Sequence, residues 1–193
     1  MQINENLKNY ILILDNVFPE KTLSNFYRIC KESNQFIDAG VVDLKGNSKI
    51  NKKERKTFIW PMHNTSSKSL TESHWANYLS FNFYRAFEEY RKRIIVPDVN
   101  ITDIQILKYT EGGFYLFHVD DGPTIPRTLS FIYFINDEYE GGELVFNFNN
   151  SGEDYVIEKK KNRMIVWPSN FLYRHSVKPT KKGIRYSVVA WAR

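Results

Sequence analysis

The feature that most constrains the fold of this chain is the change of pattern at Pro97. Beyond it, the sequence consists of short apolar stretches separated by turn-forming pairs such as Gly112-Gly113, Gly122-Pro123 and Gly141-Gly142. Short strands with breaks at such regular spacing are typical of a β-sandwich or jelly roll. The expected strands are 101–109, 114–118, 128–135, 143–148, 154–157, 163–167, 173–177 and 184–191.

Residues before Pro97 have a mixed pattern that includes two helices. Pro19 can open a helix to about residue 32, and Ser69 can cap a longer one to residue 93, with Trp75, Leu79, Phe83 and Phe87 at intervals of four. Short strands at 11–15, 36–42 and 55–60 and a polar loop at 43–53 complete this part. We therefore predict an α+β fold with a support region, residues 1–98, and a jelly-roll core, residues 99–193, in one integrated domain.

The composition excludes several classes of protein. Hydrophobic residues make up 42% of the 193 residues and charged residues 25%, which is the balance of a globular chain. The longest apolar runs, such as 11–14 and 94–96, are far shorter than the roughly 20 residues of a bilayer span, so we expect no membrane segment. Cys30 is the single cysteine, and the N-terminus lacks a basic stretch followed by an apolar one. These features predict a cytoplasmic protein without disulfides.

The net charge of +5 is modest, and the basic residues cluster at 52–56, 91–93 and 159–163. Such clusters could bind an acidic partner, or they could be solvated loops and helix ends. No cluster stands beside the stacking aromatics of a reader of single-stranded nucleic acid. We therefore favour solvated segments and expect no nucleic-acid partner.

Two of the four histidines lie in the strand-rich part, and one of them begins a His-x-Asp sequence. His118 and Asp120 are two residues apart, which places them on the same side of an extended chain. His175 lies on another expected strand. Two imidazoles and one carboxylate form the facial triad of non-haem Fe(II) oxygenases. The alternative is a structural histidine at 118 and a half-buried strand residue at 175, because His-x-Asp also occurs by chance.

Arg185 stands in an otherwise apolar expected strand, with Ser187 two positions further on and pointing the same way. A buried arginine in such a strand needs an anion, and a guanidinium can hold a carboxylate by two parallel hydrogen bonds. The alternative is an arginine on an edge strand that points to solvent, since alternation alone does not exclude it.

With these residues in place, the sequence from about Ile104 to Arg193 resembles the prolyl 4-hydroxylase group of the Fe(II)- and 2-oxoglutarate-dependent dioxygenases. Order, spacing and strand context agree with that group. The matching stretches are Tyr109-Thr-Glu-Gly-Gly-Phe-Tyr-Leu-Phe-His118-Val-Asp120, Pro126-Arg-Thr-Leu-Ser-Phe-Ile-Tyr-Phe-Ile-Asn-Asp137, Tyr139-Glu-Gly-Gly-Glu-Leu-Val-Phe146, Tyr173-Arg-His175-Ser-Val-Lys-Pro and Gly183-Ile-Arg185-Tyr-Ser187-Val-Val-Ala-Trp191.

The resemblance implies a double-stranded β-helix core, a set of cofactors and a role for each matching residue. The implied cofactors are Fe(II), 2-oxoglutarate and O₂ as cosubstrates, and ascorbate as reductant. The implied site comprises His118, Asp120 and His175 as iron ligands, Arg185 on the C5 carboxylate of 2-oxoglutarate with Ser187 in support, Tyr109 as a further cosubstrate contact, and Arg127 and Trp191 near the substrate.

The sequence also departs from its relatives in informative ways. Phe134 stands where many relatives carry a tyrosine whose hydroxyl reaches the C5 carboxylate, so that contact is lost or replaced. Asp120 argues against a halogenase of this fold, which lacks the carboxylate ligand. Trp191 occupies the position of the second arginine of related nucleic-acid demethylases, which counts against that branch.

The function implied by the resemblance is hydroxylation of a substrate with release of succinate and CO₂. We expect a prolyl residue within a peptide or protein as the substrate. A free amino acid or another small molecule is the alternative within enzymes. A catalytically silent jelly roll that binds a metal or ligand as a sensor is the alternative outside them. The sequence does not determine the oligomeric state.

Overall fold

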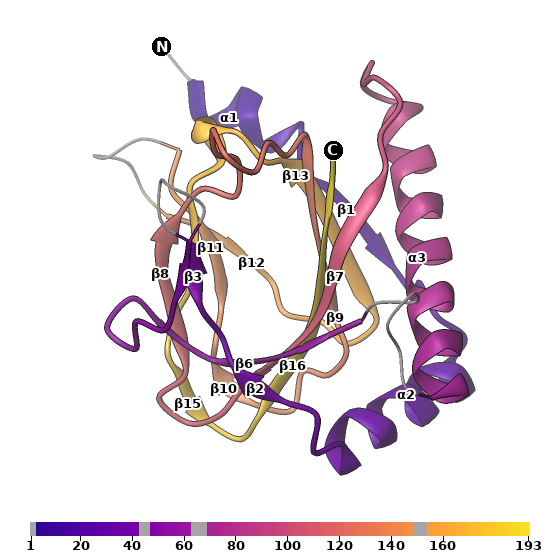
Figure 1. The fold of residues 1–193 in the computed structure, drawn as a ribbon. Coiled ribbons are helices and arrows are strands. Elements are labelled where there is room, and N and C mark those ends of the chain that lie inside the picture. Colours follow the sequence, from indigo (N-terminus) through magenta and orange to yellow (C-terminus); the bar gives the residue numbers. More distant parts are fainter. Residues whose placement is uncertain (1–2, 43–46, 63–68, 149–153) are drawn as a thin grey trace.

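The computed structural model describes residues 3–42, 47–62, 69–148 and 154–193, in which two antiparallel sheets face one another (Figure 1). This arrangement confirms the α+β fold with a jelly-roll core. The larger sheet has the order β1 (Leu12–Asp15), β13 (Arg163–Pro168), β9 (Leu129–Phe134), β16 (Arg185–Ala192), β7 (Ile101–Tyr109), β6 (Phe58–Pro61) and β2 (Ile37–Asp38). The smaller sheet has the order β12 (Tyr155–Ile157), β11 (Leu144–Phe146), β14 (His175–Val177), β8 (Phe114–His118) and β5 (Arg55–Lys56).

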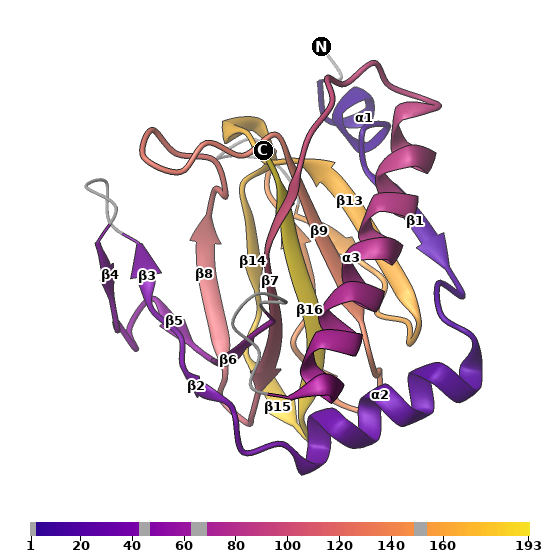
Figure 2. The same ribbon diagram turned by 45° about the vertical axis from the view of Figure 1, so that its right-hand side comes forward.

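Two helices cover the outer face of the larger sheet (Figures 1 and 2). The first, α2 (Glu20–Glu32), buries Leu23, Phe26 and Cys30. The second, α3 (Leu70–Arg91), begins as the sequence predicts, because the Ser69 hydroxyl accepts a hydrogen bond from the backbone N–H of Glu72. The apolar faces of these helices close one hydrophobic core, while the space between the two sheets holds a second.

The contact between Phe83 of α3 and Phe131 of β9 joins the long helix to the larger sheet. The two rings meet edge to face with their centroids 5.6 Å apart, and both are fully buried. Because residues of β9 also line the cavity between the two sheets, this contact helps to hold one wall of that cavity in place.

The region before Pro97 takes part in the larger sheet on both flanks. On one flank β1 pairs with β13, with Leu12 opposite Val166. On the other flank β6 pairs with β7, with Trp60 opposite Ile106. The support region therefore supplies strands as well as helices.

Several short elements escaped the sequence prediction. Helix α1 (Ile3–Lys8) and the pair β10 (Glu140–Gly141) and β15 (Thr180–Lys182) are too short to show a periodic pattern. The single strand expected at 36–42 is divided into β2 and β3 (Val41–Val42), and β3 pairs with β4 (Ser48–Lys49) inside the expected loop. Residues 43–46 of that loop and His63 lie outside the described residues.

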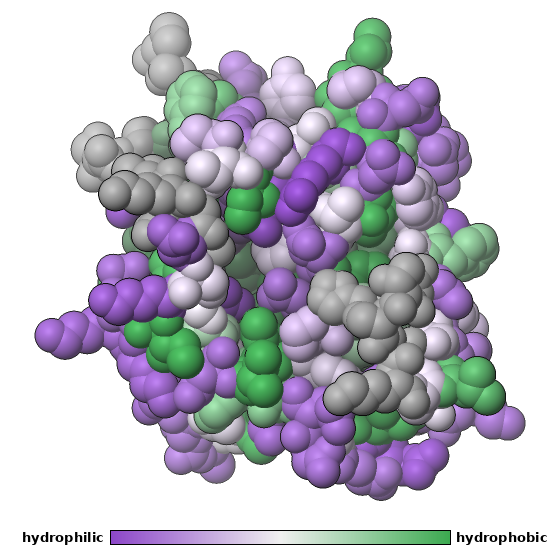
Figure 3. Space-filling model, viewed as in Figure 1, coloured by the Kyte–Doolittle hydropathy of each residue, from purple (hydrophilic) through white to green (hydrophobic). Residues whose placement is uncertain are grey.

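The surface offers little continuous apolar area on the face shown in Figure 3, where hydrophobic residues are scattered among hydrophilic ones over the described part. The longest helix, α3, carries polar and charged residues along its exposed side. Among the described residues, no helix combines the length and the apolar character that crossing a bilayer requires.

The packing of α3 generates a stability prediction. Phe83→Ala removes a fully buried ring and leaves a cavity, so the free energy of unfolding should fall by about 3–5 kcal/mol. Phe81→Ala is the matched control, because Phe81 lies on the same helix and is 59% exposed. This substitution should change the free energy of unfolding by about 0.5 kcal/mol or less. Chemical denaturation measures both values, and equal losses for the two variants would contradict the packing described.

Candidate active site

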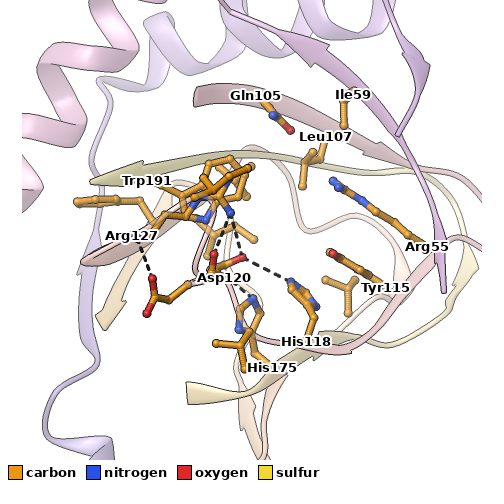
Figure 4. A pocket seen from close by; sticks show the side chains of 18 of the residues that line it. Arg55, Ile59, Gln105, Leu107, Tyr115, His118, Asp120, Arg127, His175 and Trp191 are labelled. Atoms are coloured by element: carbon orange, nitrogen blue, oxygen red, sulfur yellow. Dashed lines mark hydrogen bonds and ion pairs between the residues drawn. The ribbon is translucent and has the colours of Figure 1, made fainter. Parts of the chain in front are cut away.

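A cavity of about 330 Å³ lies between the two sheets, where β8 ends and β14 begins. The side chains that line it come from both sheets and from the segment 119–127 that follows β8 (Figure 4). The lining includes seven residues of particular chemical interest: Arg55, Gln105, Tyr109, Tyr115, Arg127, Trp167 and Trp191. The floor of this cavity is formed by the His-x-Asp residues and the distal histidine that the sequence indicated.

His118, Asp120 and His175 converge as the sequence predicts. His118 at the end of β8 stands directly opposite His175 at the start of β14, and their rings are 4.3 Å apart between centroids. The Asp120 carboxylate lies 3.7 Å from Nε2 of His118 and 3.5 Å from Nε2 of His175. One ligand atom from each residue fits within a span of 4.8 Å. Two imidazole nitrogens and one carboxylate oxygen at this spacing fit a single Fe(II) ion.

Backbone carbonyl groups orient both imidazoles toward this point. Nδ1 of His118 lies 2.9 Å from the carbonyl oxygen of Leu116, and Nδ1 of His175 lies 3.0 Å from that of Tyr173. A carbonyl oxygen only accepts hydrogen bonds, so Nδ1 carries the hydrogen in both rings and Nε2 is free to bind a metal. Burial, and next the adjacent His175, lower the pKa of His118 to about 3. This imidazole is therefore neutral at physiological pH, as a metal ligand must be.

Asp120 is held by a hydroxyl network that the sequence analysis did not identify. The Ser130 hydroxyl donates a hydrogen bond of 2.7 Å to Oδ2 of Asp120, and it lies 2.7 Å from the Ser169 hydroxyl. Burial alone would raise the pKa of Asp120, but the two histidines and the Ser130 hydrogen bond lower it on balance. The carboxylate is therefore ionised. The only signal in the sequence was a serine within the apolar stretch 129–135.

A β-bulge brings Tyr115 onto the same side of β8 as His118. Three residue steps separate Tyr115 from His118, whereas only two separate their partners Val177 and His175 on β14. The tyrosine ring stacks on the imidazole with the centroids 3.6 Å apart and an interplanar angle of 19°. Burial raises the pKa of Tyr115 to about 12, so its phenol stays protonated.

Arg55 of β5 completes a three-layer stack on this wall. Its guanidinium carbon lies 4.7 Å from the centre of the Tyr115 ring, and Nη1 donates a hydrogen bond of 3.1 Å to the carbonyl oxygen of Gly40. Simple alternation along β8 places Tyr115 and His118 on opposite faces, so Tyr115 was not predicted for the site, and neither was Arg55. Alternation also fails for Leu116, which should share the inner face with His118 but is 51% exposed, whereas Phe117 points outward as expected and packs against the charged ends of Arg174 and Lys178.

Arg127 and Trp191 form a second cation–aromatic pair on the opposite wall (Figure 4). The guanidinium carbon of Arg127 lies 3.8 Å from the centre of the Trp191 ring, and Nη1 donates a hydrogen bond of 3.2 Å to the carbonyl oxygen of Asp120. The structure thus brings both expected substrate residues next to the metal ligand, and both line the cavity.

Arg185 is completely buried, so the alternative of an arginine pointing to solvent is wrong. Its Nη1 donates a hydrogen bond of 2.8 Å to the Ser187 hydroxyl, while Nε and Nη2 have no hydrogen-bond partner among the described residues. Tyr109 stands directly opposite Arg185 on β7, and the centre of its ring lies 5.0 Å from the guanidinium carbon. Tyr109 also lines the cavity. A buried cation with two unfilled N–H groups fits a carboxylate, because leaving it unpaired is costly.

The Phe134 ring, which stands where many relatives carry a tyrosine, lies beside this guanidinium as expected. The Arg185 guanidinium carbon is 5.3 Å from the centre of the Phe134 ring. A phenylalanine ring offers no hydroxyl, so this position supplies no hydrogen bond to a bound carboxylate.

Comparisons with known proteins agree with this geometry. Residues 104–193 match the family model of the 2OG-Fe(II) oxygenase superfamily. A PKHD-type hydroxylase of Rippkaea orientalis is 34% identical over 107 residues, covering 52% of this chain and 46% of that protein. One of Stenotrophomonas maltophilia is 34% identical over 95 residues, covering 45% and 40%. The chain thus spans less than half the length of these curated relatives.

Two solved structures share the fold over nearly all of the chain. A prolyl hydroxylase of Trichoplax adhaerens, solved with a hypoxia-inducible factor peptide fragment, has a TM-score of 0.77 and 18% identity, covering 100% of this chain and 87% of that one. A Pseudomonas putida prolyl-4-hydroxylase has a TM-score of 0.75 and 17% identity, covering 98% and 96%. At these identities the likeness concerns the fold.

The hydroxyl network yields a prediction about metal affinity. Ser130→Ala leaves Oδ2 of Asp120 without its hydrogen bond, so the affinity for Mn(II), used as an air-stable probe, should fall by about tenfold or more. Ser130→Thr keeps a hydroxyl and should bind nearly as the parent does. Ser176→Ala, which removes a buried hydroxyl that does not contact Asp120, is the control. Calorimetric titration gives the constants, and parental affinity in Ser130→Ala would refute a role for this hydrogen bond.

Proposed function

We propose that this chain, whose residues 104–193 match the model of the 2OG-Fe(II) oxygenase superfamily, hydroxylates a prolyl residue of a peptide or protein and releases succinate and CO₂. One observation carries the proposal. The three candidate metal ligands line a single cavity, and the cavity-lining Tyr109 lies against the buried, half-unpaired guanidinium of Arg185. Such a site can bind a metal and a dicarboxylate together.

Each residue of the site has a distinct task in this proposal. His118, Asp120 and His175 hold Fe(II), which when bound supplies the activation of O₂ that couples oxidative decarboxylation of 2-oxoglutarate to hydroxylation. Arg185, oriented by Ser187, anchors the C5 carboxylate by a charge-assisted hydrogen bond. Tyr109 lies between this anchor and the cavity, where it orients the cosubstrate. Ascorbate would serve as the reductant that keeps iron in its ferrous state.

The shape and chemistry of the cavity support a prolyl substrate. Tyr115 and Trp191 line the cavity from opposite walls, and together with apolar side chains such as Val189 they provide apolar surface for a pyrrolidine ring. Gln105 adds a carboxamide from the third side, which can pair with a peptide group. Arg127 stands at the segment that follows the metal ligands, where it can contact substrate backbone. The Trichoplax relative was solved with a peptide fragment, which agrees with this substrate class.

The cytoplasm is the compartment that we propose for the enzyme. Cys30 is the only cysteine of the sequence, and it is a buried residue of α2. A chain that cannot form an internal disulfide is typical of a reducing compartment. A free amino acid remains the second candidate substrate, because the cavity volume of about 330 Å³ can also hold a small molecule.

The first prediction from this proposal concerns turnover. Purified protein supplied with Fe(II), ascorbate and 2-oxoglutarate should release succinate faster when proline-containing peptides are present, and mass spectrometry should find one added oxygen on proline. Asp120→Ala removes the carboxylate ligand and should abolish both signals. If only a free amino acid stimulates succinate release, the substrate is a small molecule. If the protein binds the metal or 2-oxoglutarate but releases no succinate, it is a sensor.

The second prediction concerns the cosubstrate anchor. Arg185→Ala removes the buried cation, so the dissociation constant of 2-oxoglutarate should rise by about thirtyfold or more, the equivalent of about 2 kcal/mol. Mn(II) affinity should stay at the parental value, because Arg185 does not contact the metal ligands in any interaction described above. Arg185→Lys, which keeps the charge, should recover part of the affinity. Unchanged 2-oxoglutarate binding in Arg185→Ala would place the cosubstrate elsewhere.

A further inference from the structure

We infer that the hydroxyl groups of Tyr139 and Thr180 complete the carboxylate site at Arg185, and that they replace the hydroxyl that Phe134 does not provide. This inference rests on the proposed function, because it assigns further residues to the cosubstrate site. The hydroxyls of Tyr139 and Thr180 would then determine specificity, because they favour a dicarboxylic 2-oxo acid over one without a distal carboxylate.

The three side chains converge on one point beside Gly142. A Cβ placed on Gly142 would lie 3.0 Å from Cδ of Arg185, 3.1 Å from Oγ1 of Thr180 and 3.1 Å from Cε2 of Tyr139. Gly142 has a φ of +66°, which favours glycine, and these distances are too short for any side chain at this position. The glycine at 142 therefore allows the side chains of Arg185, Thr180 and Tyr139 to pack close to one another.

All three groups are buried, and each has hydrogen-bonding capacity left over. The exposed fractions of Arg185, Thr180 and Tyr139 are 0%, 1% and 5%. Within the described part of the chain, no well-formed hydrogen bond reaches Nε and Nη2 of Arg185, Oγ1 of Thr180 or the Tyr139 hydroxyl. Buried polar atoms without such bonds are rare and costly, and four of them in one cluster indicate a polar ligand.

The charge of the cluster identifies the ligand as an anion. Arg185 carries the positive charge, and its two unpaired N–H groups are donors only. Burial raises the pKa of Tyr139, although the positive charge of Arg185 and its polar contact with the phenol oxygen oppose this shift, so the phenol remains protonated and can donate to a ligand. Thr180 can donate as well. A carboxylate, which accepts through both oxygens, satisfies such a set of donors.

Hydrogen bonds that do not involve the two hydroxyls hold Thr180 and Tyr139 in place. Thr180 donates its N–H to the carbonyl oxygen of Gly113 and accepts a hydrogen bond from the N–H of Gly112, at 2.9 and 2.8 Å. Lys159 donates a hydrogen bond to the carbonyl oxygen of Tyr139, and its ammonium lies 4.6 Å from the centre of that ring. Neither contact uses the two hydroxyls, which therefore remain available for the ligand.

The test compares two ligands on hydroxyl-deletion variants. Tyr139→Phe and Thr180→Val should each raise the dissociation constant of 2-oxoglutarate by about tenfold to a hundredfold, measured by calorimetry on the Mn(II)-loaded full chain. Pyruvate, which has the same metal-chelating end but no distal carboxylate, should bind the variants and the parent equally weakly. The ratio of the two constants therefore reports on the distal site alone, without a need for turnover.

Conservative variants separate this role from a loss of structure. Thr180→Ser keeps the hydroxyl and should bind 2-oxoglutarate nearly as the parent does. Tyr186→Phe is the matched control for the tyrosine, because Tyr186 follows Arg185 on β16 but packs into the core beneath the helices. Unchanged 2-oxoglutarate binding in both Tyr139→Phe and Thr180→Val would overturn the inference, as would equal losses for pyruvate.

The outcome also distinguishes this inference from the proposed function. If the parent chain binds no 2-oxoglutarate, the proposed function fails, and the inference fails with it. If the parent binds and only Arg185→Ala weakens binding, the proposed function stands and the two hydroxyls are excluded.

Discussion

The pairing of β8 with β14 is the constraint on which the rest of the site depends. It sets His118 opposite His175, and the extra residue in β8 turns Tyr115 toward the same side. Asp120 reaches the two imidazoles because it follows His118 by two residues, and the Ser130 hydroxyl on the facing sheet fixes its carboxylate. The geometry of the metal site is thus a property of two sheets held face to face, and the helices behind the larger sheet hold that sheet in position.

Electrostatic balance explains why this interior tolerates several ionised groups. Asp120 is a buried, ionised carboxylate, which is stable only with positive charge nearby, and the Arg127 guanidinium lies 3.9 Å from it. At the other end of the site, the Ser187 hydroxyl is the one described group that accepts a hydrogen bond from the buried Arg185 guanidinium. The protein alone therefore leaves one region ready for a cation and another ready for an anion, and a metal with a dicarboxylate satisfies both.

Much of this site can be predicted from sequence because its key residues lie in regular strands with informative neighbours. His118, Asp120, His175 and Arg185 are polar residues at fixed spacings in apolar stretches, so their types and positions already indicate their chemistry. The residues that escaped prediction depend on local irregularity or on distant pairing. Tyr115 faces inward only because of a bulge, and a bulge has no reliable sequence signature. Tyr139 and Thr180 meet across the two-residue strand β10, which is too short to leave a pattern.

The two walls of the cavity come from different parts of the chain. Trp191 and Arg127 belong to the stretch that matches the oxygenase family, whereas Arg55 comes from the support region and reaches the site through its stack on Tyr115. The metal centre and one wall are thus encoded in one half of the chain, and part of the other wall is encoded in the half that the family model does not cover. Divergence in that first half can alter what the cavity accepts while leaving the three candidate metal ligands untouched, so one core can be combined with different scaffolds.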